Sequence, residues 1–135
     1  MSFTVSDEET RKVIADFLEM GHVDNIIALF RQDPSCYRMA GEILDDERFR
    51  VRMGMVVLFE SLRDLDPDHL PLAVDSLAAL LTRPAADYVR GEAATALGLI
   101  GSEEALALVR QLADDPSPQL RELALDILGD ERGRR

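Results

Sequence analysis

Residues 88–101 read YVRGEAATALGLIG, and this stretch decides the fold. The arrangement of apolar, arginine and small residues in 89–98 returns 31 positions later, in residues 120–129. The matched pairs are Val89 with Leu120, Arg90 with Arg121, Ala93 with Ala124, Leu97 with Leu128 and Gly98 with Gly129. A period between 20 and 50 residues is typical of proteins built from stacked structural repeats.

The repeat also extends toward the start of the chain. A shift of 38 residues places Val51-Arg52 on Val89-Arg90, and a shift of 32 places Leu77, Leu80 and Pro84 on Val109, Leu112 and Pro116. Each unit therefore has a first segment that carries an arginine and a second segment that ends at a proline. Because apolar residues recur at spacings of three and four, both segments are predicted to be helices.

The same spacing and the local start and stop signals predict helices along the whole chain. Ser6 and Glu9 have the spacing of a helix-capping box, and Gly21 stands where a left-handed residue closes a helix. The predicted helices cover residues 7–20, 23–31, 35–46, 49–62, 69–82, 86–100, 102–113 and 118–128.

Residues 88–101, together with 105–112 and Asp114-Asp115-Pro116, resemble HEAT repeats, and most closely the short variant named after phycobilisome lyases. This resemblance implies an all-α fold, a right-handed superhelix of helical hairpins, in a single domain over residues 1–135. We expect repeats at 47–84 and 85–116, a half repeat at 117–130 and a tail at 131–135. Residues 1–46 form either a degenerate repeat or an N-terminal cap.

The arginines at the repeated position are expected to be structural. Arg90 and Arg121 lie early in their helices, as Arg52 does, and can bond to an acidic side chain or to turn carbonyls. Asp87 and the turn before residue 85 are within reach of Arg90. Asp114 and Asp115 are within reach of Arg121.

Composition excludes several kinds of function. The 135 residues carry 15 Lys and Arg against 26 Asp and Glu, which gives a net charge of −11. Such a chain repels nucleic acid, and Arg48, Arg50 and Arg52 do not share one helical face. No apolar run approaches the roughly 20 residues that span a membrane, and the acidic start does not fit a signal peptide. We therefore expect no nucleic-acid or membrane partner and a cytoplasmic location.

The few candidate reactive residues do not form a recognisable catalytic or metal site. Cys36 is the single cysteine, and neither His22 nor His69 is near it in sequence. The aspartates at 64, 66 and 68 superficially copy a calcium loop, but His69 stands where that loop needs glycine. No His-Glu pair of the kind used by di-iron helical-repeat hydroxylases is present. We expect no cofactor and no enzymatic activity.

What remains is a surface for a partner protein. In stacked helix pairs the second helices usually line the concave side, here residues 23–31, 70–82 and 102–113. A shallow groove of this kind suits a peptide or a helix of a partner. The predicted partner-binding residues are Asp75, Ala79, Arg83, Ala107, Arg110 and Gln111. The sequence thus favours a non-catalytic adaptor or regulatory subunit, and the alternative is a small bilin-lyase-like accessory or chromophore-binding protein.

The last predicted helix allows a further interaction. Its apolar residues include Leu123 and Ile127, and no later segment is predicted to cover them. Either this strip packs wholly against the preceding helices, or it pairs with a second copy in a two-fold homodimer.

Overall fold

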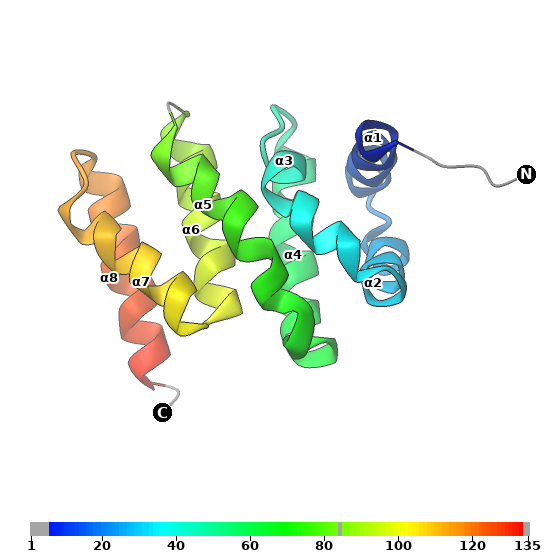
Figure 1. The fold of residues 1–135 in the computed structure, drawn as a ribbon. Helices are drawn as coiled ribbons and strands as arrows, with labels where there is room; N and C mark the ends of the chain where they lie inside the picture. Colours follow the sequence, from blue (N-terminus) through cyan, green and yellow to red (C-terminus); the bar gives the residue numbers. More distant parts are fainter. Residues whose placement is uncertain (1–5, 84, 134–135) are drawn as a thin grey trace, which may run out of the picture.

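The computed structural model describes the backbone of residues 6–83 and 85–133 and the side chains as far as residue 129. Every regular element in these residues is an α-helix or a 3-10 helix (η), so the chain forms an all-α helical-repeat solenoid (Figure 1). The elements are α1 (Asp7–Glu19), α2 (Val23–Gln32), η1 (Pro34–Met39), α3 (Ala40–Leu44), α4 (Phe49–Leu65), η2 (Pro67–Ala73), α5 (Val74–Thr82), α6 (Asp87–Ile100), α7 (Glu103–Gln111), η3 (Leu112–Asp114) and α8 (Pro118–Gly133).

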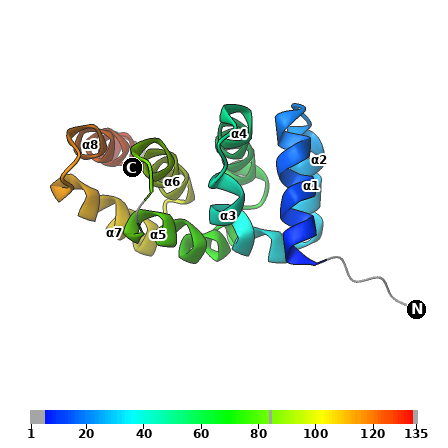
Figure 2. The ribbon, with the colours of Figure 1, turned by 90° about the horizontal axis from the view of Figure 1, so that it is seen from above.

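The helices stack in two layers, which are seen edge-on in Figure 2. In one layer α1 packs against α4, α4 against α6, and α6 against α8. The other layer consists of η1 with α3, η2 with α5, and α7; we call it the α3–α5–α7 layer. Helix α6 lies near the centre of the stack and contacts α4, α5, α7 and α8.

Small residues let neighbouring helices approach closely. Ala93, Ala94 and Ala96 of α6 are buried, and a Cβ at Gly98 would lie 2.5 Å from Cγ2 of Ile127 on α8. At the crossing of α3 and α5, a Cβ at Gly41 would lie only 2.1 Å from the backbone oxygen of Ser76. These positions hold the helix axes closer than larger side chains would allow.

The ends of the helices follow the local sequence signals. The Ser6 side chain accepts a hydrogen bond from the Glu9 amide at 3.1 Å, and Gly21 has a φ of +86°, so the Ser6 cap and the left-handed Gly21 are confirmed. Gly101 has a φ of +68° and closes α6, after which Ser102 caps α7. A left-handed residue and a new cap in succession give the sharp turn between α6 and α7.

The structure corrects the predicted helix boundaries in two places. Residues 35–46 are divided between η1 and α3, and residues 67–73 form η2 before α5 begins at Val74. Pro34 and Pro71 lie in the 3-10 segments, because proline lacks the amide that a continuous α-helix needs.

The predicted position of residues 23–31 was wrong. Helix α2 packs against α1, α4 and η1, whereas η1 and α3 are the elements that pack beside η2 and α5. The α3–α5–α7 layer therefore continues through residues 34–44. Asp33-Pro34 ends α2. The next helix, η1, then occupies the position in the α3–α5–α7 layer that residues 23–31 were predicted to take.

Candidate interaction surface

Two grooves open on the α3–α5–α7 layer. The first lies between α3 and α5, has a volume of about 430 Å³, and is called here the α3–α5 groove. Its charged walls pair with one another, since Arg83 bonds to Asp45 and Arg11 lies 3.5 Å from Glu42. Its lining consists of Arg11, Gly41, Glu42, Asp45, Ser76, Ala79, Leu80 and Arg83.

The floor of the α3–α5 groove depends on the close crossing of its two helices. The Gly41 amide donates a hydrogen bond to Oγ of Ser76 at 2.9 Å, and that hydroxyl donates to the carbonyl of Ala73 at 3.3 Å. The Ser76 hydroxyl therefore joins the Gly41 amide of α3 to the Ala73 carbonyl at the end of η2. This arrangement keeps the groove shallow and its shape defined.

The second groove, called here the α5–α7 groove, has a volume of about 450 Å³ and is lined by residues from η1, η2, α5 and α7. Pro71 and Leu72 give it an apolar part, and Asp75 and Glu104 bring carboxylates. Arg38 of η1 completes the lining. Because the residues come from successive elements of one layer, the groove exists only in the assembled solenoid.

The structure brings three of the predicted partner-binding residues to these grooves. Asp75 lines the α5–α7 groove, and Ala79 and Arg83 line the α3–α5 groove. The other three, Ala107, Arg110 and Gln111, lie on α7 but line neither groove.

The lining residues Arg38 and Glu42 were not predicted from the sequence, because η1 and α3 were not assigned to this layer. The sequence did contain a signal that could have placed η1 beside η2. Asp33-Pro34 and the buried apolar residues that follow it resemble the Asp66-Pro67 start of η2.

The repeated arginines bind turns. Nη1 of Arg52 donates to the carbonyls of Asp46 and Glu47, and Nη1 of Arg121 donates to those of Asp115 and Pro116. Each arginine thus closes the turn that precedes its own helix.

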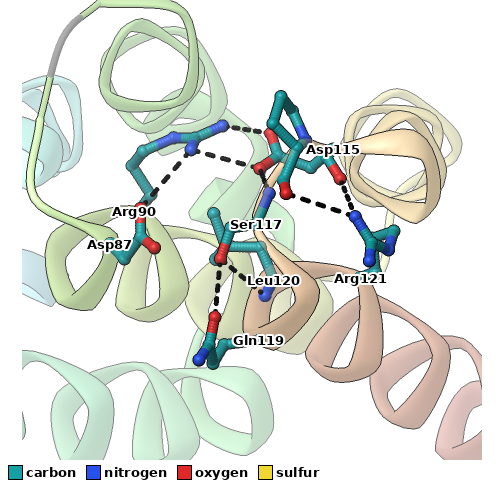
Figure 3. A network of polar contacts seen from close by, with 8 residues as sticks. Asp87, Arg90, Asp115, Ser117, Gln119, Leu120 and Arg121 are labelled. Atoms are coloured by element: carbon teal, nitrogen blue, oxygen red, sulfur yellow. Dashed lines mark hydrogen bonds and ion pairs between the residues drawn. The ribbon is translucent and has the colours of Figure 1, made fainter.

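Arg90 bonds mainly to a turn that follows its helix, whereas Arg52 and Arg121 bond to the turns that precede theirs. Both of its terminal nitrogens contact the Asp115 carboxylate, which lies in the turn after η3, and Nη1 is also 3.7 Å from Asp87 (Figure 3). The Asp115 carboxylate also accepts the Ser117 amide at 2.9 Å. Asp115 therefore connects α6 to the start of α8. The hydrogen bond from Arg90 is the main cause that lowers the pKa of Asp115.

Arg52 makes a second contact, with Glu92 on α6. Its Nε lies 2.9 Å from a Glu92 carboxylate oxygen, and its guanidinium lies 4.4 Å from the ring centre of Tyr88. Burial raises the pKa of Glu92, and the charge of Arg52 opposes this effect. Arg52 thus neutralises a partly buried carboxylate on the neighbouring helix while it holds its own turn.

A second polar cluster joins η1 to η2. The buried Tyr37 donates its hydroxyl to Asp66 at 2.9 Å, and Nδ1 of His69 lies 2.8 Å from the other oxygen of the same carboxylate. Burial, followed by the bond to Asp66, raises the pKa of Tyr37. The neighbouring Cys36 is buried, and burial and nearby negative charge raise its pKa to about 11. A thiol with this pKa is neutral near pH 7 and a poor nucleophile.

Large exposed apolar side chains lie on the opposite layer. Among the described residues they occur on α1 or its C-terminal cap, on α4, on α6 and on α8. They are Val13, Met20, Phe49, Val57, Leu65, Tyr88 and Leu125. Phe49 and Tyr88, 63% and 52% exposed, flank the guanidinium of Arg52.

Neither a metal-binding cluster nor a membrane-spanning helix is present in the described part of the chain. No group of three or more His, Cys, Asp or Glu residues there is placed to hold a metal ion. No helix within it has the length and apolar character needed to cross a membrane.

The C-terminal part of the chain matches a known protein family. Residues 74–135 match the family model of HEAT repeats. This HEAT-repeat match covers α5 to α8, including Arg90 and Arg121, and it supports a HEAT-repeat family. The phycobilisome-lyase subtype remains a prediction. Neither the curated proteins nor the solved structures gave a match.

Proposed function

We propose that this protein is a non-catalytic adaptor or regulatory subunit that presents its α3–α5–α7 layer to a partner protein. The observation that carries this proposal is the pair of grooves on one layer of a HEAT-like solenoid, each lined by successive elements. Helical solenoids of this kind use extended concave surfaces for binding. Asp75, Ala79 and Arg83 are the predicted residues that a partner in these grooves would contact.

The test is to block the layer without unfolding it. Ala79 lines the α3–α5 groove, Asp75 lines the α5–α7 groove, and both are exposed, so Ala79→Trp and Asp75→Trp place a large side chain in each groove. Ala28→Trp on α2 is the matched control, because Ala28 is exposed and outside this layer. Each variant is tagged, expressed in the native host and purified with its bound proteins, and its thermal unfolding is measured separately.

We expect a stoichiometric protein partner with the wild type and with Ala28→Trp, and its loss with Ala79→Trp or Asp75→Trp at unchanged unfolding temperature. Equal recovery with all variants would place the partner elsewhere. An absorbing pigment recovered in place of a polypeptide would instead support the chromophore-binding alternative.

A further inference from the structure

The α5–α7 groove contains charges that the protein itself leaves without partners. Asp75, Glu104 and Arg38 line it, all three are exposed, and none makes a hydrogen bond or ion pair with another described residue. The α3–α5 groove differs, because its acids Asp45 and Glu42 are paired with arginines. The two grooves are similar in volume but differ in the charge that they offer to a ligand.

The lining of the α5–α7 groove has an apolar part and an anionic part. Pro71 and Leu72 contribute the apolar surface, and the carboxylates come from α5 and α7. Lysine and arginine have the complementary shape, because a long aliphatic stem covers apolar surface while the cationic end bonds to carboxylates. The two carboxylates outnumber the single guanidinium, and the net charge of −11 attracts cations to the whole molecule.

We propose that the α5–α7 groove binds an arginine or lysine side chain of a partner polypeptide, with its stem on Pro71 and Leu72 and its cation on the carboxylates of Asp75 and Glu104. This inference rests on the proposed adaptor function and specifies the chemistry of the partner. Arg38 repels the cation from the η1 side and directs it toward Asp75 and Glu104.

The test uses two blocked tripeptides of defined sequence, acetyl-Leu-Arg-Leu-amide and acetyl-Leu-Gln-Leu-amide. Each is titrated into the ¹⁵N-labelled full chain, and the amide shifts are followed by NMR at two salt concentrations. The arginine peptide should give saturable shifts centred on residues 72–75 and 104–105. The glutamine peptide should bind more weakly, and added salt should reduce the difference between them.

Variants of the lining give opposite expected effects. Asp75→Asn and Glu104→Gln should each weaken binding of the arginine peptide by roughly two- to fivefold, the range of an exposed ion pair. Arg38→Gln should strengthen it by up to about the same factor, because it removes a like charge. Glu60→Gln, an exposed carboxylate on α4 outside the groove, should leave the affinity unchanged.

Shifts spread over all surface acids, or equal affinity of the wild type and the Asp75→Asn/Glu104→Gln double variant, would overturn the inference. Failure of the inference differs from failure of the adaptor function. If the native partner is recovered equally with the double variant, the adaptor function stands and the cation-binding groove does not. If the arginine peptide binds as expected but no partner is recovered, the cation-binding groove stands and the adaptor function does not.

Discussion

Arg52 and Arg121 close equivalent turns with the same atoms. From Nη1, Arg52 donates to the carbonyls six and five residues earlier at 2.9 and 2.8 Å, and Arg121 does so at 2.7 and 3.3 Å. In both turns the first of these residues is an aspartate, Asp46 or Asp115, whose carboxylate accepts the amide two residues later. Two turns in different parts of the chain thus have one hydrogen-bonding pattern.

The intervening Arg90 contacts a later turn, where both of its terminal nitrogens reach the Asp115 carboxylate that follows η3. In the sequence, position 84 is proline, where the other two repeats have the aspartates Asp46 and Asp115. Each of the three repeated arginines therefore stabilises a turn, but Arg90 acts on a later one.

The contact between Arg90 and Asp115 predicts a pH-dependent contribution to stability. The pKa of Asp115 is lowered in the folded protein, so its contribution is complete above the ordinary value of 3.8 and is lost as pH falls below that value. Arg90→Gln should cost about 1–3 kcal/mol of unfolding free energy near pH 7 and less near pH 3. Urea unfolding at both pH values measures this difference.

Arg110→Gln is the control for this prediction, because Arg110 is exposed and lies 3.7 Å from an exposed Glu103. It should cost less than about 0.5 kcal/mol at either pH. An equal cost of Arg90→Gln at both pH values would contradict the assigned role of the Asp115 carboxylate.

Removing Arg52 should leave Glu92 without its compensating charge. Arg52→Gln is expected to destabilise the fold by roughly 3 kcal/mol near pH 7. The raised pKa of Glu92 means that the folded state binds a proton more readily than the unfolded state, so the penalty should shrink as pH falls from 7 toward 5. The double variant Arg52→Gln/Glu92→Gln should recover part of the loss at pH 7. No recovery would show that the lost turn hydrogen bonds account for the whole effect.

Two glycine substitutions should change the free energy of unfolding in opposite directions. Gly41→Ala forces a Cβ against the Ser76 backbone, and we expect a loss of at least about 1–3 kcal/mol. Gly129→Ala in α8 meets no atom within 4 Å and should stabilise by about 0.4–1 kcal/mol. Thermal unfolding of the two variants measures this contrast. A tolerated Gly41→Ala would show that α3 and α5 separate easily.

Aspartate substitutions distinguish the apolar face of α8 that packs against the core from the apolar face that is exposed. Ile127 packs against the core beside Gly98, so Ile127→Asp should cost about 2–5 kcal/mol or unfold the chain. Leu125 is 62% exposed, and Leu125→Asp should change stability by less than about 0.5 kcal/mol. The strip at Leu123 and Ile127, through which a homodimer was predicted as one alternative, packs against the core. Light scattering on the Leu125 variant therefore tests pairing through the exposed face of α8: a lower mass than wild type supports it, and a wild-type monomer opposes it.

The helices and their stacking were predictable because one periodic pattern, repeated along the chain, determines both. The repeated stretch at 88–101 includes Ala93, Ala94 and Ala96, and these small residues are buried in α6. The capping role of Ser6 and the left-handed Gly21 depend on local chemistry, and both were found as expected.

The neighbours of each helix were harder to predict. Periodicity shows which face of α2 is apolar but not which element that face meets, so its place was assigned wrongly. The contact of Arg90 with Asp115 joins residues 25 positions apart, and a repeat pattern does not show which side chains meet across that distance. Three predicted partner residues on α7 miss the grooves, because groove position depends on how far apart adjacent helices lie.

The bond between Arg90 and Asp115 bears on how such a chain can grow by gene duplication. The arginine lies in the first helix of one repeat, and its carboxylate is encoded 25 residues later, after η3. A copied DNA segment that ended between them would produce a protein in which this guanidinium keeps only its 3.7 Å contact with the exposed Asp87. Successful duplications are therefore expected to carry the codon of the following aspartate with them.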